Sequence, residues 1–392
     1  MTHKMTVRPG SRLVVGVLLA IAFLDELFDG FWGAAWPLVR DDLALSYSEI
    51  GLLMSVPTLI SIALEPPLGV LADAGWRRPI ALGGGVAYTA ALLLLVAAPG
   101  FTALLAGMSL FYVASGAFVN LSQATLIDLA PERSEALMAR WVLVGSVAMT
   151  AGPLWLAAAE WLGLGWRSGC AALAAVTLAL TGLAARTPAL RSDAGGEPAP
   201  PLAEAAREAL EALKRGAVLR WLVMLQLAEL LLTVFPGFVA LYLVDVVGLT
   251  PTQTGWALAL ATAAGLGGDA LLLPALERVS GLTWVRVTAG VASLALVALV
   301  AAPNLVPLKV GLLALLYASC AGWYAILKGR LYEELPGRSG TVIATTTLFS
   351  VVGIGAPVAI GAVASAAGLE VALGLLAVGP AALAITLPRE GA

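Results

Sequence analysis

An apolar stretch from Leu13 to Val39 carries three carboxylic acids, Asp25, Glu26 and Asp29, near its middle. About 25 helical residues, each rising about 1.5 Å, cross a hydrocarbon core about 30 Å thick, so this length predicts a membrane helix. Each acid at the centre of such a helix costs about 2.5 to 3.5 kcal/mol on insertion scales. We therefore expect these acids to face a protein-lined or water-filled interior.

The rest of the chain is similarly apolar, with 60% hydrophobic and 12% charged residues. Polar or Pro/Gly breaks divide it into twelve segments long enough to cross a bilayer, which predicts an all-α integral membrane protein. These segments cover about 13–38, 47–72, 79–98, 101–128, 138–162, 166–185, 218–243, 252–275, 284–303, 307–332, 340–365 and 368–387. Because Lys and Arg favour cytoplasmic loops, their distribution predicts that both termini of this multi-pass protein lie in the cytoplasm.

One long polar segment divides the twelve predicted helices into two groups. We expect an N-terminal six-helix bundle over 1–185, a cytoplasmic linker with an amphipathic helix over 186–217, and a C-terminal six-helix bundle over 218–392. A shift of 204 positions places Asp25 on Glu229, Asp41 on Asp245, Gly51 on Gly255, Glu65 on Asp269 and Asp73 on Glu277; Gly152-Pro153 falls on Ala356-Pro357. These matches predict two pseudo-symmetric copies related by an axis along the membrane normal, with a pathway between them.

The sequence GVLADAGWRRP follows the second predicted helix and contains Gly69, Asp73, Arg77 and Arg78. Gly69 would let helices approach closely, and Asp73 could meet a helix N-terminus or a cytoplasmic arginine. The segment resembles the loop between the second and third helices of the major facilitator superfamily, although Ala74 and Trp76 stand where that family usually has a basic residue and a glycine. The preceding stretch AAWPLVRDDLALSYSEIGLLMSVPTLIS resembles the fosmidomycin-resistance type of bacterial exporter within that superfamily.

The resemblance implies that the first, fourth, seventh and tenth helices line a central cavity. Asp25 and Asp29 are four residues apart and share a helix face, whereas Glu26 points elsewhere. We expect proton coupling or substrate binding by Asp25, Asp29, Glu229 and Lys328, and a cavity lined by Tyr112, Asn120, Gln123, Tyr317, Trp323 and Tyr324. Static carboxyl pairs that only hold helices together are the alternative, and Lys328 could neutralise an acid or bind an anionic group on the substrate.

Other residues are expected to act in gating. Besides the loop motif, these are Glu65, Asp269 and Glu277, together with Gly152 and Pro153 in the fifth predicted helix. Gly152-Pro153 resembles part of a glycine-proline motif of antiporters, and small residues at a close helix contact are the alternative interpretation.

These features predict a secondary active transporter that works by alternating access and couples the export of a small organic or drug-like solute to proton entry. A proton-coupled symporter importing a sugar, organic anion or lipid-like solute is the alternative, and a non-transporting membrane receptor a remote one. We do not expect an enzyme, because the sequence has no nucleotide-binding glycine loop, no H-E-x-x-H motif and a single histidine, His3. We expect no cofactor, metal or nucleic-acid partner, and a monomer in the lipid bilayer driven by the proton gradient.

Overall fold

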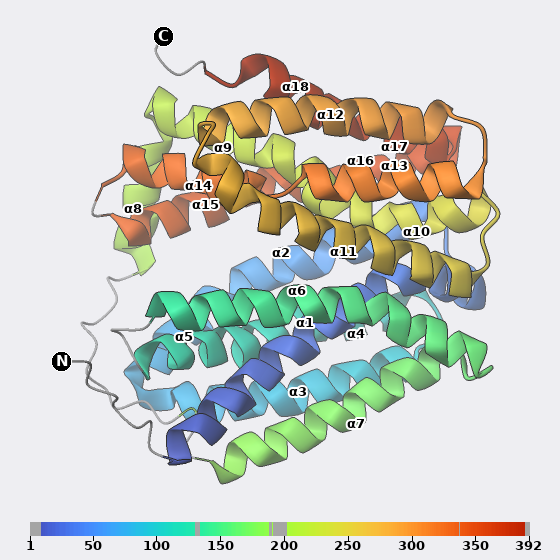
Figure 1. The fold of residues 1–392 in the computed structure, drawn as a ribbon. Coiled ribbons are helices and arrows are strands. Elements are labelled where there is room, and N and C mark those ends of the chain that lie inside the picture. The colour runs from blue at the N-terminus through green and yellow to red at the C-terminus, as the bar shows by residue number, and fades with distance from the viewer. Residues whose placement is uncertain (1–8, 130–133, 188–189, 191–201, 337, 389–392) are drawn as a thin grey trace.

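The computed structural model describes residues 9–129, 134–187, 190, 202–336 and 338–388, and every element in them is a helix (Figure 1). We call residues 9–187 the N-terminal half and residues 216–388 the C-terminal half. The N-terminal half contains α1 (Pro9–Leu43), α2 (Tyr47–Leu71), η1 (Ala72–Trp76), α3 (Arg77–Ala97), α4 (Phe101–Ser115), η2 (Gly116–Asn120), α5 (Leu121–Asp128), α6 (Ser134–Trp161) and α7 (Gly165–Arg186).

The C-terminal half packs above it in the view of Figure 1, and α8 (Leu202–Leu213) lies between the two halves in sequence. The helices of the C-terminal half are α9 (Gly216–Glu229), η4 (Leu230–Val234), α10 (Phe235–Asp245), α11 (Pro251–Leu276), α12 (Gly281–Ala301), α13 (Val306–Ser319), α14 (Trp323–Glu334), α15 (Ser339–Gly353), α16 (Gly355–Ala367), α17 (Leu369–Leu376) and α18 (Val378–Thr386).

Eleven helical segments of the described chain are long and apolar enough to cross a membrane. They coincide with the predicted segments from the second to the twelfth. Helix α1 is long enough as well, but its apolar stretch contains Asp25, Glu26 and Asp29, and it is not among the eleven. The crossing of α1 therefore stays a prediction.

Helix α8 is the part of the predicted linker that the structure describes, since most of residues 186–201 lie outside the described residues. It packs against α15, with Ala209 and Ala212 buried and Glu208 accepting a hydrogen bond of 2.7 Å from Thr341. Leu210 is exposed rather than part of the packed face. A helix is present where one was predicted, and Leu213 packs against the core while Leu210 does not.

The bundle has two ends, which we name by their residues. At the Arg40 end, α1 ends and α2 begins; at the linker end, α1 begins and α8 lies (Figure 1). The two halves meet mainly where α2 packs on α16 and α6 packs on α11, with α1 also touching α10.

Close backbone contacts join the halves, and the predicted repeat relates two of them to each other. A Cβ atom on Gly51 of α2 would lie 2.4 Å from the carbonyl oxygen of Pro357 in α16. A Cβ atom on Gly255 of α11 would lie 2.7 Å from the carbonyl oxygen of Pro153 in α6. Glycine is needed at both positions because any side chain would push the two helices apart.

Five long helices of the described chain are interrupted: the last two predicted segments at Ile354 and Ala377, and three others near their middle. The π-type turns η2 and η4 interrupt the helices that begin with α4 and α9, while residues 320–322 separate α13 from α14. Gly322 has a φ of +74°, in the left-handed region that favours glycine. Such turns are common at functional sites because they re-aim the side chains beside them. The other three interrupted helices are the fourth, seventh and tenth predicted segments.

Candidate functional site

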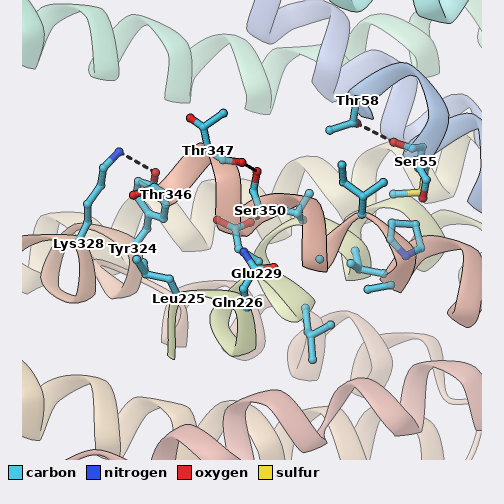
Figure 2. Close-up of a pocket in the computed structure, with 18 of the residues that line it drawn as sticks. Ser55, Thr58, Leu225, Gln226, Glu229, Tyr324, Lys328, Thr346, Thr347 and Ser350 are labelled. Carbon is cyan, nitrogen blue, oxygen red and sulfur yellow. Dashed lines mark hydrogen bonds between the residues drawn. The ribbon is translucent and has the colours of Figure 1, made fainter. Parts of the chain in front are cut away.

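A cavity of about 480 Å³ lies between the two halves (Figure 2). Small-molecule sites usually have volumes of about 300 to 1,000 Å³, so its size suits a small solute. Its walls are formed by α2, α4, α9, η4, α14, α15 and α16, through Met54, Ser55, Thr58, Tyr112, Leu225, Gln226, Glu229, Leu230, Thr233, Val234, Tyr324, Lys328, Ile343, Thr346, Thr347, Ser350, Gly353, Ile354, Ala356 and Pro357.

Glu229 and Lys328 are the charged side chains among these lining residues. Glu229 accepts a hydrogen bond from Thr233, four residues further along the chain. Lys328 donates a hydrogen bond of 2.8 Å to the Tyr324 hydroxyl and lies 4.9 Å from the centre of its ring. The two opposite charges are therefore held by partners on their own helices and form no ion pair with each other (Figure 2).

Asp25 faces the interior of the N-terminal half rather than the cavity. Its carboxyl group accepts a hydrogen bond of 2.8 Å from Ser115 at the end of α4, and the hydroxyl of Tyr88 lies close by. Phe28 and Phe111, with ring centres 4.2 Å apart, pack beside this group. The prediction that Asp25 lines the same cavity as Glu229 is therefore wrong, because α1 is rotated so that Asp25 points between α3 and α4.

Asp29 lies one turn further along α1, and its side chain is exposed. It interacts electrostatically with Asp25 and with Tyr112, and Tyr112 lines the cavity. Neither aspartate forms an ion pair with a basic residue in the described part of the chain. Glu26 is directed elsewhere, as predicted, with its Cγ atom 3.2 Å from the position of a Cβ on Gly145 in α6.

Four of the six predicted cavity-lining residues lie away from this cavity. Trp323 is fully buried and donates a hydrogen bond of 2.8 Å to Thr288 of α12, because the break at Gly322 turns its side chain away from the cavity and toward α12. Tyr317 lines a second cavity of about 210 Å³ beside Asp269. Asn120 is the last residue of η2 and Gln123 lies in α5, and neither is among the residues that line the central cavity. Tyr112 and Tyr324 do line it.

Glu65 and Asp269, which the repeat pairs, each lie beside a helix break. Glu65 accepts hydrogen bonds of 2.5 Å from Ser61 and 3.4 Å from Asn120, and it packs against Gly116 where η2 begins. Asp269 lies beside the backbone of Gly322 at the break before α14. Both acids thus contact an irregular turn of a neighbouring helix, and their role in gating stays a prediction.

The loop motif is described in part. Asp73 lies in η1, and its side chain is outside the described residues. Arg77 forms an ion pair with Asp128 at the end of α5, and Arg78 donates to the carbonyl oxygens of Thr187 at 3.0 Å and Ala185 at 2.6 Å. These contacts join helices of the same half.

Gly69 and Glu277 are two further members of the predicted gate, and both lie in open positions. No heavy atom outside its own helix backbone lies within 4 Å of a Cβ on Gly69, so this glycine makes no close helix contact here. The prediction for Gly69 is wrong in this conformation, because the glycine contacts between the halves are near the other end of the bundle. Glu277 is exposed at the end of α11.

Gly152 and Pro153 make close helix contacts. A Cβ on Gly152 would lie 2.3 Å from the backbone nitrogen of Phe31, and one on Gly30 would lie 2.4 Å from the carbonyl oxygen of Met149. Helices α1 and α6 therefore cross closely at these glycines, while Pro153 contacts Gly255 of the other half. This geometry favours the structural interpretation of the motif.

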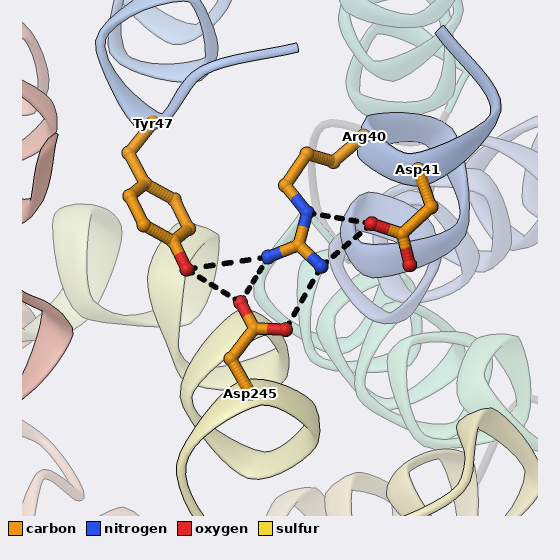
Figure 3. A network of polar contacts seen from close by, with 4 residues as sticks. All are labelled: Arg40, Asp41, Tyr47 and Asp245. Carbon is orange, nitrogen blue, oxygen red and sulfur yellow. Dashed lines mark hydrogen bonds and ion pairs between the residues drawn. The ribbon is translucent and has the colours of Figure 1, made fainter. Parts of the chain in front are cut away.

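A polar network joins the two halves at the Arg40 end (Figure 3). The guanidinium of Arg40 contacts Asp41 on its own helix and both carboxylate oxygens of Asp245 at the end of α10. The Tyr47 hydroxyl donates a hydrogen bond of 2.6 Å to Asp245. Burial lowers the pKa of Arg40, but its hydrogen bonds to Asp245 and Asp41 raise it by more, so the guanidinium stays charged.

The sequence signalled this network only indirectly. The repeat pairs Asp41 with Asp245, and an arginine between two repeat-related acids is the feature that could have revealed it. Ser48 adds a contact of 3.0 Å to Ser365 of α16 at the same end. These contacts join the two halves at the Arg40 end.

The fold is that of known membrane transporters. Solved structures of a bacterial homologue of the human lysosomal transporter Spinster, inward-facing and either unoccupied or occupied, match with TM-scores of 0.79 and 0.80 at 15% and 14% identity, each covering 97% of this chain and 96% of the other. The nucleoside transporter NupG matches with a TM-score of 0.75 at 13% identity, covering 95% of this chain and 98% of the other. No curated protein sequence gives a significant match.

These likenesses show the fold of the chain, and the family is shown by its sequence. The sequence profile of the Major Facilitator Superfamily matches residues 18–357, and the chain belongs to that superfamily. The fosmidomycin-resistance subtype stays a prediction.

Proposed function

We propose that this chain is a secondary active transporter of the bacterial inner membrane that exports a small organic or drug-like solute in exchange for protons. In this proposal α1 is a twelfth membrane helix, and the linker end faces the cytoplasm. The observation that carries the proposal is the pair Asp25 and Asp29 on α1 of the N-terminal half, beside a tyrosine that borders the cavity.

Both aspartates can take part in proton transfer because two neighbouring carboxyl groups repel each other when both are charged. Proton uptake by either one removes the repulsion between them and changes the electrostatics at Tyr112. A ligand or proton shifts a conformational equilibrium by its difference in affinity for the two states. Coupling then requires only that the aspartates hold their protons more tightly in one state than in the other.

The closed Arg40 end supports an inward-facing assignment for this conformation. The hydrogen bonds that join the two halves of the described chain, those of Arg40, Tyr47 and Ser48, lie at that end. With the linker end in the cytoplasm, the cavity would be reached from the inside, as an exporter needs when it binds its solute.

Proton-coupled symport is the second candidate, and Lys328 favours it. An ammonium group in the cavity suits a solute with an anionic group, which an importer of organic anions would carry. The direction of solute flux relative to proton flux distinguishes the two candidates.

The test uses chain reconstituted in liposomes that contain a pH-sensitive dye, with candidate solutes added outside. Asp25→Asn should abolish solute-dependent proton flux while the protein remains folded, whereas Glu26→Gln, a matched change on the other face of α1, should retain it. Unchanged proton flux in Asp25→Asn would refute the assignment of Asp25. Tight solute binding without any solute-dependent proton flux in the wild type would instead favour a receptor.

A further inference from the structure

The two charges in the central cavity balance each other without touching. Glu229 is the last residue of α9, directly before η4, and Lys328 lies in the second turn of α14, after the break at Gly322. Each charge is therefore placed by an irregular stretch of its helix, and each has one side-chain partner on that helix. The cavity carries one negative and one positive group, and its charged lining sums to zero.

Both groups have unused hydrogen-bonding capacity. A carboxylate can accept about four hydrogen bonds and an ammonium group donates three, whereas one side-chain hydrogen bond is formed by Glu229 and one by Lys328. A charge in a largely apolar cavity gains most from a partner of opposite charge, because the low-polarity surroundings screen it weakly. A solute with only one charge would satisfy one of the two groups and leave the other without a counter-ion.

Hydroxyl groups on α15 provide hydrogen-bond acceptors in the cavity. Thr346 donates to the carbonyl oxygen of Val342 at 2.7 Å, and Ser350 donates to that of Thr347 at 2.7 Å. Because their hydrogens are already engaged, these hydroxyl oxygens present lone pairs to the cavity (Figure 2). They therefore suit a solute that carries N–H donors.

We propose that the central cavity binds a small zwitterionic solute, with its ammonium group at Glu229 and its anionic group at Lys328. This inference rests on the proposed transport function and names the class of solute that it moves. The apolar residues of the wall, such as Leu225, Leu230 and Ile343, contact the body of the solute. A zwitterion neutralises both charged groups at once, which neither a cation nor an anion can do.

Blocked derivatives of one compound test the proposal directly. Leucine, leucyl-leucine and 6-aminohexanoate differ in the separation of their two charges; N-acetylation removes the positive charge of each, and amidation removes the negative one. Binding to the purified full chain is measured by calorimetry and by the rise in melting temperature, since a ligand that binds only the folded state raises apparent stability. We expect at least one free zwitterion to bind tenfold or more tightly than either of its blocked forms.

Two variants should change this preference in opposite directions. Glu229→Gln should abolish the preference for the free zwitterion over its N-acetylated form and keep the preference over its amide. Lys328→Met should do the reverse. As matched controls, Glu211→Gln and Lys214→Met remove exposed charges on and after α8 and should leave both preferences unchanged.

Each outcome has one meaning. Wild-type binding of a blocked form as tight as its zwitterion would overturn the proposal, and so would the failure of every free zwitterion in the series to bind. Because binding is measured at equilibrium without a gradient, selective binding with no proton flux in liposomes would refute the transport function and leave the proposed solute class intact. Proton-coupled flux of a singly charged solute would support the transport function and overturn the proposed solute class.

Discussion

Replacing Asp245 by asparagine should release the Arg40 end of the transporter. Arg40 contacts both carboxylate oxygens of Asp245, and the two side chains are only 16% and 19% exposed. Such charge-assisted contacts contribute about 1.5 to 3 kcal/mol. Since about 1.4 kcal/mol corresponds to a factor of ten, the balance between closed and open states of this end should shift about ten- to a hundredfold toward the open state.

Asp41 provides a matched control. It contacts the same guanidinium, but it neighbours Arg40 on the same helix and is 64% exposed. An exposed ion pair contributes about 0 to 1 kcal/mol, and this one does not join the halves. Asp41→Asn should therefore change the balance much less than Asp245→Asn.

Distances between spin labels measure the shift. Labels at Ala44 and Leu305, both exposed near the Arg40 end, report the separation of the two halves after the native cysteines, Cys170 and Cys320, are replaced by serine. Asp245→Asn should add a population at longer distance. Equal distance distributions for the two aspartate variants would refute the view that Asp245 holds this end closed.

Two stability predictions complete the set, both measured by thermal unfolding. Gly51→Ala places a methyl group 2.4 Å from the Pro357 carbonyl oxygen and should cost about 1 to 3 kcal/mol, whereas Gly33→Ala, in open space, should cost little; equal losses would contradict the close contact. Lys309 is fully buried with two uncharged acceptors, one of them the Leu299 carbonyl oxygen, so Lys309→Met should leave the melting temperature unchanged or raise it. A fall of more than about 3 °C would show that the ammonium group stabilises the fold.

The membrane segments could be predicted because their signal is local: apolar length and interrupting polar residues suffice. The repeat could be predicted too: a shift of 204 positions pairs Gly51 with Gly255 and Pro153 with Pro357, and these residues form two equivalent contacts between the halves. The family resemblance similarly placed Tyr112 in a helix that lines the cavity.

The orientation of side chains could not be predicted in the same way. Spacing shows that Asp25 and Asp29 share a face, but the rotation of α1 depends on packing against α3 and α4, which is not local. The break at Gly322 likewise turned Trp323 away from the cavity. Lys309, near the start of the tenth predicted segment, likewise lies inside the bundle, where a tyrosine and a carbonyl oxygen satisfy it.

The paired glycine contacts have a mechanical consequence. Two points define a line, and a rotation about the line through the Gly51 and Gly255 contacts leaves both in place. From Gly51, helix α2 extends about 30 Å toward Leu71 but only about 6 Å back to Tyr47. A tilt of about 10° therefore moves the long arm by about 5 Å and the short arm by about 1 Å. A movement of about 1 Å at the Tyr47 end is enough to lengthen a hydrogen bond beyond its normal range. The same tilt moves the Leu71 end by about half a helix diameter.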